Sequence, residues 1–223
     1  MGIVQTIANG NNPLGTKLTF KTEIDGPALL LVSGSAYANV YPNVVIGYNV
    51  EIDGVAAGSP QLYSNLLNSH VTLVSSFQQI NITPGDHVLT IDALTPWMTA
   101  DAFDVFSVSL WDQAEPAFVW QINGPVPQYT TFNSEVSGTA LVFLQGSAWS
   151  GSGNQNLGLM VVLDGNPVLT VASFVNEANS HHALPAFIAP VQMTPGEHKI
   201  GISTTSGDFN SDSNDFYTLA VMF

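Results

Sequence analysis

The sequence contains no cysteine and no arginine, and only three lysines, Lys17, Lys21 and Lys199, against 17 acidic residues. Without cysteine the chain forms neither disulfides nor thiolate metal sites, and it has no cysteine nucleophile. Nucleic acid is not expected as a partner, because phosphates are neutralised by clustered lysine and arginine. Membrane insertion is not expected either, because no apolar run approaches the roughly 18 residues that a spanning helix needs.

Charge is scarce as well as one-sided. Charged residues make up 9% of the chain, and the formal net charge at pH 7 is −14; a typical globular protein has about 25% charged residues. Most carboxylates therefore lack a cationic partner, and divalent cations or mild acid are expected to relieve their mutual repulsion. The first residues, MGIVQTIANG, contain neither the basic nor the apolar segment of a signal peptide, so we expect none here. An extracellular or cell-surface role stays open.

The sequence repeats itself at an offset of 111 residues. ITPGDHVLTI begins at Ile82 and MTPGEHKIGI begins at Met193. Upstream the offset becomes 112, where GSAY before Asn39 matches GSAW. Further matches at 111 are Asp53-Gly54 with Asp164-Gly165, Asn68-Ser69-His70 with Asn179-Ser180-His181, and Asp101 and Asp104 with Asp212 and Asp215. These matches predict a tandem duplication with one domain at 1–112 and a second at 113–223, each large enough to hold its own core.

The local pattern is that of β-strands throughout. Residues 44–52 alternate between apolar and polar or small side chains, and an Asp-Gly pair typical of a hairpin turn follows them. Thr-Pro-Gly favours a tight turn, because Pro fixes φ and Gly supplies a positive φ. About eight such strands in each half, without helical periodicity, predict an all-β fold of two tandem β-sandwiches, either jelly-roll or immunoglobulin-like.

The length of each half and its short connections rich in Asn, Ser and Gly resemble the compact jelly rolls of the TNF/C1q-like superfamily. Some bacterial members of that superfamily serve as lectins. The resemblance extends over each half and implies two tandem homologous jelly-roll β-sandwich domains. It also implies a homo-oligomer, with the trimer as the assembly of that superfamily, and carbohydrate as the ligand.

Two kinds of residue are candidates for carbohydrate binding. The string Asn-x-x-Asn-Ser-His occurs in both halves, and its side chains can donate to and accept from sugar hydroxyls or bind a metal. Aromatic rings can stack on a pyranose. The alternatives are Asx and Ser turns with a histidine that caps a strand, and aromatic rings packed on the sheet. The predicted ligand-binding residues are Trp97, Tyr37, Trp149, Asn65, Asn68, His70, Asn176, Asn179 and His181.

The stretch DFNSDSND places oxygen-bearing side chains at alternate positions, so Asp208, Asn210 and Asp212 are candidate calcium ligands. It is not an EF-hand, because Gly is missing at the sixth position and Glu at the twelfth. Trp97 and Thr99 replace the first two ligands in the first half, so we expect any calcium site in the second half alone. The alternative is a solvated turn, and no other cofactor is expected.

Two further features concern structure. His87 and His198 share strand parity with apolar positions, which predicts hydrogen-bonded structural histidines. Met160 and Val162 stand where the first half has Asn49 and Glu51, and extra apolar residues on an outer strand face indicate an interface, between domains or between subunits.

The motifs of common enzyme classes are absent from the sequence: there is no G-x-S-x-G, no H-E-x-x-H and no Walker loop. We therefore expect a protein that is not an enzyme. The sequence favours an oligomeric binding protein that recognises carbohydrate in a lectin-like, multivalent way. The alternative is a structural self-assembling subunit of a shell, appendage or virion, whose partner is itself.

Overall fold

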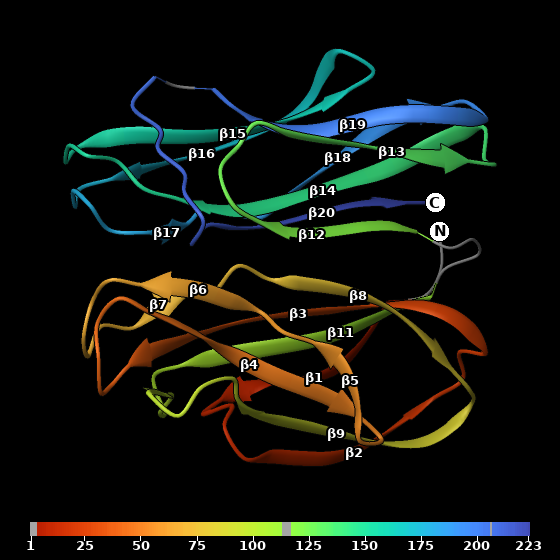
Figure 1. The fold of residues 1–223 in the computed structure, drawn as a ribbon. Coiled ribbons are helices and arrows are strands. Elements are labelled where there is room, and N and C mark those ends of the chain that lie inside the picture. The colour runs from red at the N-terminus through yellow and green to blue at the C-terminus, as the bar shows by residue number, and fades with distance from the viewer. Residues whose placement is uncertain (1–3, 113–116, 206) are drawn as a thin grey trace. The chain divides into compact units, whose positions relative to one another are not determined.

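The computed structural model describes residues 4–112, 117–205 and 207–223, and Figure 1 shows it as a ribbon. The chain divides into two compact units, Met1–Ala117 (unit 1) and Phe118–Phe223 (unit 2). The boundary predicted after residue 112 falls beside residues 113–116, outside the described residues. In the described part of the chain, no helix is long and apolar enough to cross a membrane.

Unit 1 consists of two antiparallel sheets, which are coloured from red to green in Figure 1. One sheet has the order β1 (Val4–Asn11), β11 (Val105–Asp112), β3 (Gly26–Ala38), β8 (Ser76–Ile82), with the short strands β7 (Val71–Thr72) and β10 (Met98–Thr99) paired to the end of β3. The other has the order β2 (Thr16–Thr22), β9 (Gly85–Ala93), β4 (Val44–Ile52), β5 (Val55–Gly58), with β6 (Gln61–Ser64) also paired to β4.

Unit 2 is built in the same order. Its first sheet is β12 (Phe118–Asn123), β20 (Phe216–Met222), β14 (Gly138–Ala148), β18 (Phe187–Met193), with β17 (His182–Ala183) paired to the end of β14. Its second sheet is β13 (Gln128–Ser134), β19 (Gly196–Thr204), β15 (Gln155–Leu163), β16 (Asn166–Val175).

The strand order identifies each unit as a jelly roll. If β5 and β6, which both pair with β4, are counted as one interrupted strand, and the two-residue strands β7, β10 and β17 are left out, each unit has eight strands. The first, eighth, third and sixth share one sheet, and the second, seventh, fourth and fifth share the other. This pairing distinguishes the jelly roll from the immunoglobulin-like alternative. The predicted all-β jelly-roll fold is confirmed, whereas descent of the two units from one ancestral sandwich stays a prediction.

The repeated Thr-Pro-Gly-acid-His string is a structural device. Gly85 has a φ of 139°, so the turn between β8 and β9 uses a conformation that is open to glycine. His87 follows it, with Nδ1 at 2.6 Å from Asp53 Oδ2 and Nε2 at 2.8 Å from the carbonyl oxygen of Thr83. The histidine therefore ties its own turn to the Asp-Gly turn that follows β4.

The same ties recur in unit 2. His198 Nδ1 lies 2.7 Å from Asp164 Oδ2, and Nε2 lies 2.7 Å from the carbonyl oxygen of Thr194. Asp164 and Gly165 both have a positive φ, which is the signature of a type I′ hairpin turn. His87 and His198 are thus buried and hydrogen-bonded, as strand parity predicts.

The core of each unit lies between its two sheets. Of the predicted inward positions of β4, Val44 is partly buried, whereas Ile46, Tyr48, Val50 and Ile52 are buried and Tyr48 is fully enclosed. The core of unit 2 is made by fully buried aliphatic side chains of four central strands, among them Val142, Leu144, Leu159, Val161, Ile200, Ile202 and Leu219. This packing holds the long strands in place. The loops that join the strands at one end of unit 1 form the candidate site.

Candidate binding site at the loop end of unit 1

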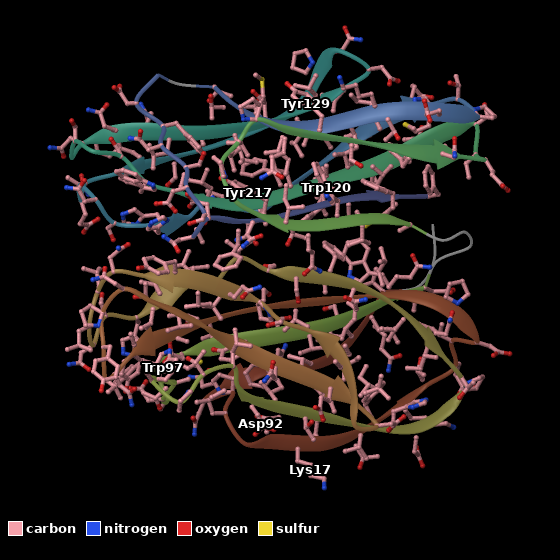
Figure 2. All side chains as sticks on the ribbon, in the orientation of Figure 1. Lys17, Asp92, Trp97, Trp120, Tyr129 and Tyr217 are labelled. Atoms are coloured by element: carbon pink, nitrogen blue, oxygen red, sulfur yellow. The ribbon has the colours of Figure 1, made fainter. Side chains whose placement is uncertain are left out.

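Three segments meet where β3 ends, and we call them together the loop end: residues 37–41, 65–70 and 95–104. β10 pairs with the last two residues of β3, and the backbone N–H of Asn68 donates to the carbonyl oxygen of Ala38 at 2.8 Å. The backbone N–H of Asn39 donates to the carbonyl oxygen of Trp97 at 3.0 Å. Figure 2 labels Trp97 at this end of unit 1. Backbone pairing therefore brings together candidate ligand-binding residues that are distant in the sequence.

His70 and two aspartates form the polar centre of the loop end. His70 Nδ1 lies 3.0 Å from Asp104 Oδ1, and His70 Nε2 lies 3.8 Å from Asp101 Oδ2. The side chain of Asp104 is fully buried, whereas that of His70 is 40% exposed and that of Asp101 is comparably open. A buried carboxylate thus positions an imidazole whose other nitrogen is open to a ligand.

Asp104 is held by two donors besides His70. Its Oδ1 accepts from Ser35 Oγ at 2.9 Å, and its Oδ2 accepts from the backbone N–H of Asp101 at 3.0 Å. Ser35 Oγ in turn accepts from the backbone N–H of Val105 at 3.1 Å. Because the Ser35 hydroxyl donates to Asp104 and not to His70, these side chains do not form a nucleophile and base pair.

The electrostatics of the site favour protonation of the ring. The hydrogen bond with Asp104 raises the pKa of His70; desolvation opposes this shift, and the charges of Asp104 and Asp101 add to it. Burial, followed by the charge of Asp104, raises the pKa of Tyr48 well above its ordinary range, and the Tyr48 hydroxyl donates to the carbonyl oxygen of Ser35. A neutral tyrosine therefore stands behind the cluster.

Aromatic rings surround His70. The Tyr37 ring centroid lies 4.5 Å from that of His70, and Phe103 approaches His70 edge-on at 6.4 Å. Phe103 is 83% exposed and Trp97 is 37% exposed. The loop end therefore presents apolar rings next to an imidazole and a carboxylate, an arrangement that can stack on one face of a sugar and hydrogen-bond to its hydroxyls.

Unit 2 contains the same polar cluster in a closed form. His181 Nδ1 lies 3.0 Å from Asp215 Oδ1, and His181 Nε2 lies 3.7 Å from Asp212 Oδ2. Ser147 Oγ donates to Asp215 at 2.8 Å, as Ser35 does to Asp104. The His181 side chain is only 5% exposed, and the ring of Trp149 lies 6.1 Å from it. This histidine therefore has little surface to offer a ligand.

The exposed aromatics of unit 1 have no counterparts in unit 2. At the offset of 111 residues, Asp208 stands for Trp97 and Asn214 stands for Phe103. Trp149, the counterpart of Tyr37, is partly buried, and its Nε1 is enclosed without a hydrogen-bond partner among the described residues. Of the two repeated clusters, only that of unit 1 combines accessible rings with an accessible histidine.

The predicted asparagines have different surroundings. Asn65 Nδ2 donates to Asn43 Oδ1 at 3.0 Å, so Asn65 braces its loop. Asn68 and Asn179 have positive φ values of 54° and 57°. The backbone N–H of Asn68 donates to the carbonyl oxygen of Ala38 at the end of β3, and that of Asn179 donates to the carbonyl oxygen of Ser150. Asn65, Asn68 and Asn179 therefore help to form turns. The side chains of Asn68, Asn176 and Asn179 are nevertheless exposed.

The structure groups the candidate metal ligands differently from the predicted calcium loop. Asp212 lies with His181 and Asp215, and the equivalent group in unit 1 is His70, Asp101 and Asp104. Asp208 and Asn210 are exposed and belong to neither group; Asn210 forms a backbone bridge with Trp149. Alternation within one stretch did not find these groups, because their members come from two loops.

Sequence reasoning did not assign Asp101, Asp104, Ser35 or Phe103 to the site. A signal was present, because His70 and the two aspartates recur together as His181, Asp212 and Asp215 with the same spacings. Joint repetition of a histidine and two carboxylates favours a shared site over three separate turns. No such repetition pointed to Phe103, because the residue at the equivalent position of unit 2 is Asn214.

No protein-family model matches the chain, and no curated protein matches it. Among solved structures, PNGF-II is 9% identical with a TM-score of 0.41, over 98% of this chain and 65% of that one, so this chain spans less than two thirds of its length. The globular domain of zebrafish complement 1qA protein is 16% identical with a TM-score of 0.35, over 49% and 97%. The stem and receptor binding domain of spike protein P1 from bacteriophage PM2 is 10% identical with a TM-score of 0.30, over 99% and 96%. At these values the likenesses carry no inference about function.

Proposed function

We propose that this protein is a non-enzymatic carbohydrate-binding protein, that its ligand site is the loop end of unit 1, and that it acts as a homo-oligomer. The observation that carries the proposal is the exposure of Phe103 edge-on to His70, in the same loop end as the exposed Trp97 and Asp101. Large rings that stay in contact with water contribute little hydrophobic stabilisation to the fold, and a group of them with polar neighbours is typical of a binding surface.

The chemistry of the loop end matches that of a sugar ring. A pyranose has a face of C–H groups that packs on an aromatic ring and a rim of hydroxyls that both donate and accept. Trp97 and Phe103 provide rings, His70 and Asp101 provide polar atoms open to solvent, and Asn68 provides an amide. Such a shallow site suits weak binding by each copy.

Each chain has one such site under this proposal, because the counterpart in unit 2 is closed around His181. Multivalency then comes from association of several chains and not from the two units of one chain. Linked weak sites gain avidity through effective concentration, without new contacts at any site.

A glycan array in buffer with EDTA tests the proposal. We expect binding by the wild type and loss of binding in Trp97→Ala and Phe103→Ala. Phe187→Ala is the matched control, because Phe187 is also an exposed aromatic, at 49%, but belongs to β18 of unit 2, on the sheet that does not carry an apolar outer row. Circular dichroism shows whether each variant is folded. Absence of binding at millimolar glycan, or equal loss in the Phe187 variant, contradicts the proposal.

A second candidate function, a structural self-assembling subunit, is favoured by the outer face of one sheet. In unit 1 the row Lys17, Thr90, Glu51 crosses the outer face of the β2–β9–β4–β5 sheet. In unit 2 the equivalent row is Tyr129, Gly201, Val162, and Met160 and Phe174 extend it. Figure 2 labels Lys17 and Tyr129 on these faces. The fold does not require the apolar row, because unit 1 folds with a charged one.

Light scattering separates the two functions. A closed small oligomer favours the carbohydrate-binding protein, and open filaments or large shells favour the structural subunit. Met160→Glu places a charge in the apolar face and is expected to reduce the assembled mass under both functions. Asn49→Glu is the matched control at the equivalent position of unit 1. An unchanged mass in the Met160 variant rules out this face as the interface.

A further inference from the structure

We propose that His70 Nε2 and Asp101 Oδ2 bind a divalent metal ion of the zinc class at the loop end of unit 1. Asp104 is not a ligand of this ion; it positions the His70 ring from behind. The proposal concerns metal binding alone and does not rest on carbohydrate recognition, because it is tested without any glycan.

The first step concerns which nitrogen of His70 carries a proton. Asp104 is fully enclosed and accepts from Ser35 Oγ, from the N–H of Asp101 and from His70 Nδ1. A carboxylate with three such donors acts as an acceptor, so the hydrogen of the neutral imidazole lies on Nδ1. The lone pair of Nε2 then points away from Asp104. Metal-binding histidines are commonly oriented in this way by a carboxylate on the far nitrogen.

The second step concerns what Nε2 faces. Asp101 Oδ2 lies 3.8 Å from it, beyond the 3.5 Å limit of a hydrogen bond. In the neutral imidazole, Nε2 and the carboxylate oxygen are both acceptors, so they repel each other unless a cation, either a proton or a metal ion, lies between them. The three lysines stand on β2 and β19 and are not part of the cluster. The pair is therefore arranged for a cation that comes from solution.

The third step is the fit of the distance to a metal. Bonds of about 2.0–2.2 Å to nitrogen and oxygen at a tetrahedral angle separate two ligand atoms by about 3.4 Å, and the observed 3.8 Å corresponds to an angle of about 120–130° at the metal. One imidazole nitrogen with one carboxylate oxygen favours zinc, cobalt or nickel over calcium, which prefers a larger set of oxygens. Both side chains are open to solvent, so water completes the coordination.

The same arrangement in unit 2 argues against accident. There the two distances are 3.0 Å and 3.7 Å, against 3.0 Å and 3.8 Å in unit 1. Three side chains from two loops keep this geometry although the surrounding rings differ between the units. The accessible copy is the one in unit 1, and the proposal is made for that copy.

Titration of the wild type with Co²⁺ tests the proposal, with visible absorption to detect ligation by histidine and Mg²⁺ in excess to occupy weakly binding carboxylates. We expect Asp101→Asn to bind one Co²⁺ fewer per chain than the wild type. Asparagine keeps an oxygen to accept from the backbone N–H of Phe103, as Asp101 Oδ1 does at 2.8 Å, so the turn is preserved. Asp92→Asn, which removes an exposed charge on β9, is the matched control.

A second readout keeps the test independent of folding defects. Zn²⁺ should raise the melting temperature of the wild type and of Asp92→Asn, and the rise should be smaller in Asp101→Asn and His70→Gln, whose melting temperatures in EDTA serve as reference. The proposal is overturned if the wild type binds no Co²⁺, or if Asp101→Asn binds as many ions as the wild type. In the first case the cation between the two groups is a proton.

Discussion

Asp53→Asn should make unit 1 less stable in mild acid and leave its stability nearly unchanged in base. Both nitrogens of His87 face acceptors, Asp53 Oδ2 at 2.6 Å and the carbonyl oxygen of Thr83 at 2.8 Å. Both nitrogens must therefore donate, and the imidazolium is the form that the site holds. The hydrogen bond with Asp53 accordingly raises the pKa of His87, and the same bond lowers the pKa of Asp53.

The direction of the pH dependence follows from these two shifts. The raised pKa of His87 stabilises the folded state fully below the unfolded value of 6.5, and this stabilisation is lost as pH rises through the folded pKa. The lowered pKa of Asp53 stabilises the folded state above the unfolded value of 3.8, and this is lost as pH falls through the folded pKa. The pair contributes fully between these two unfolded values.

The size of the effect depends on exposure. The side chain of Asp53 is 48% exposed, so solvent screens its interaction with His87. The pair is therefore expected to contribute about 1 kcal/mol to the free energy of unfolding, less than a buried charged hydrogen bond does. For a unit of this length that corresponds to about 4 °C in melting temperature. Asparagine tolerates the φ of 53° at this position and can still accept from the N–H of Val88, so only the charge is removed.

Differential scanning calorimetry in EDTA at roughly pH 5 and roughly pH 9 measures the effect. Asp53→Asn should lose about 1 kcal/mol at the lower pH and clearly less at the higher pH. Asp164→Asn repeats the change on the equivalent pair in unit 2, where His198 Nδ1 lies 2.7 Å from Asp164 Oδ2. Asp92→Asn controls for the removal of one negative charge. Equal losses at both pH values, or the same loss in the control, would refute the reasoning.

Two further predictions concern unit 2 and are measured by urea unfolding. Ser147→Ala should cost about 2 kcal/mol, because it removes one donor from the fully buried Asp215 and the acceptor for the N–H of Phe216; a loss near zero would mean that water replaces the hydroxyl. Leu144→Ala should cost about 3 kcal/mol, because the side chain is fully enclosed in the core. Ile188→Ala, at an exposed position of β18, should cost far less, and similar losses would contradict the described packing.

Local patterns in the sequence were sufficient to predict strands and turns. Alternation over residues 44–52 reflects the period of a strand with one buried face, and β4 is found there. The Asp-Gly pair predicts a turn because both residues tolerate a positive φ, and Asp53 and Gly54 have values of 53° and 76°. The parity of His87 predicts that it is buried. Each of these inferences depends only on neighbours along the chain.

The candidate site depended on contacts that no local pattern encodes. His70 and Asp104 are separated by 34 residues and come together because β7 and β10 both pair with the end of β3. The calcium prediction relied on spacing within one stretch, and the structure places Asp208 and Asn210 outside the cluster that contains Asp212. Loops have no periodicity, so spacing along a loop says little about which side chains meet.

The sequence by itself determined the class of fold, the repetition of one unit and the residue types at the repeated positions, because those follow from periodicity and identity. The tertiary structure alone decided that His70 is open while His181 is closed, and that the rings of Trp97 and Phe103 face solvent. Accessibility is the outcome of packing between segments that are distant in sequence. Two copies of one sequence pattern can therefore differ in what they offer to a ligand.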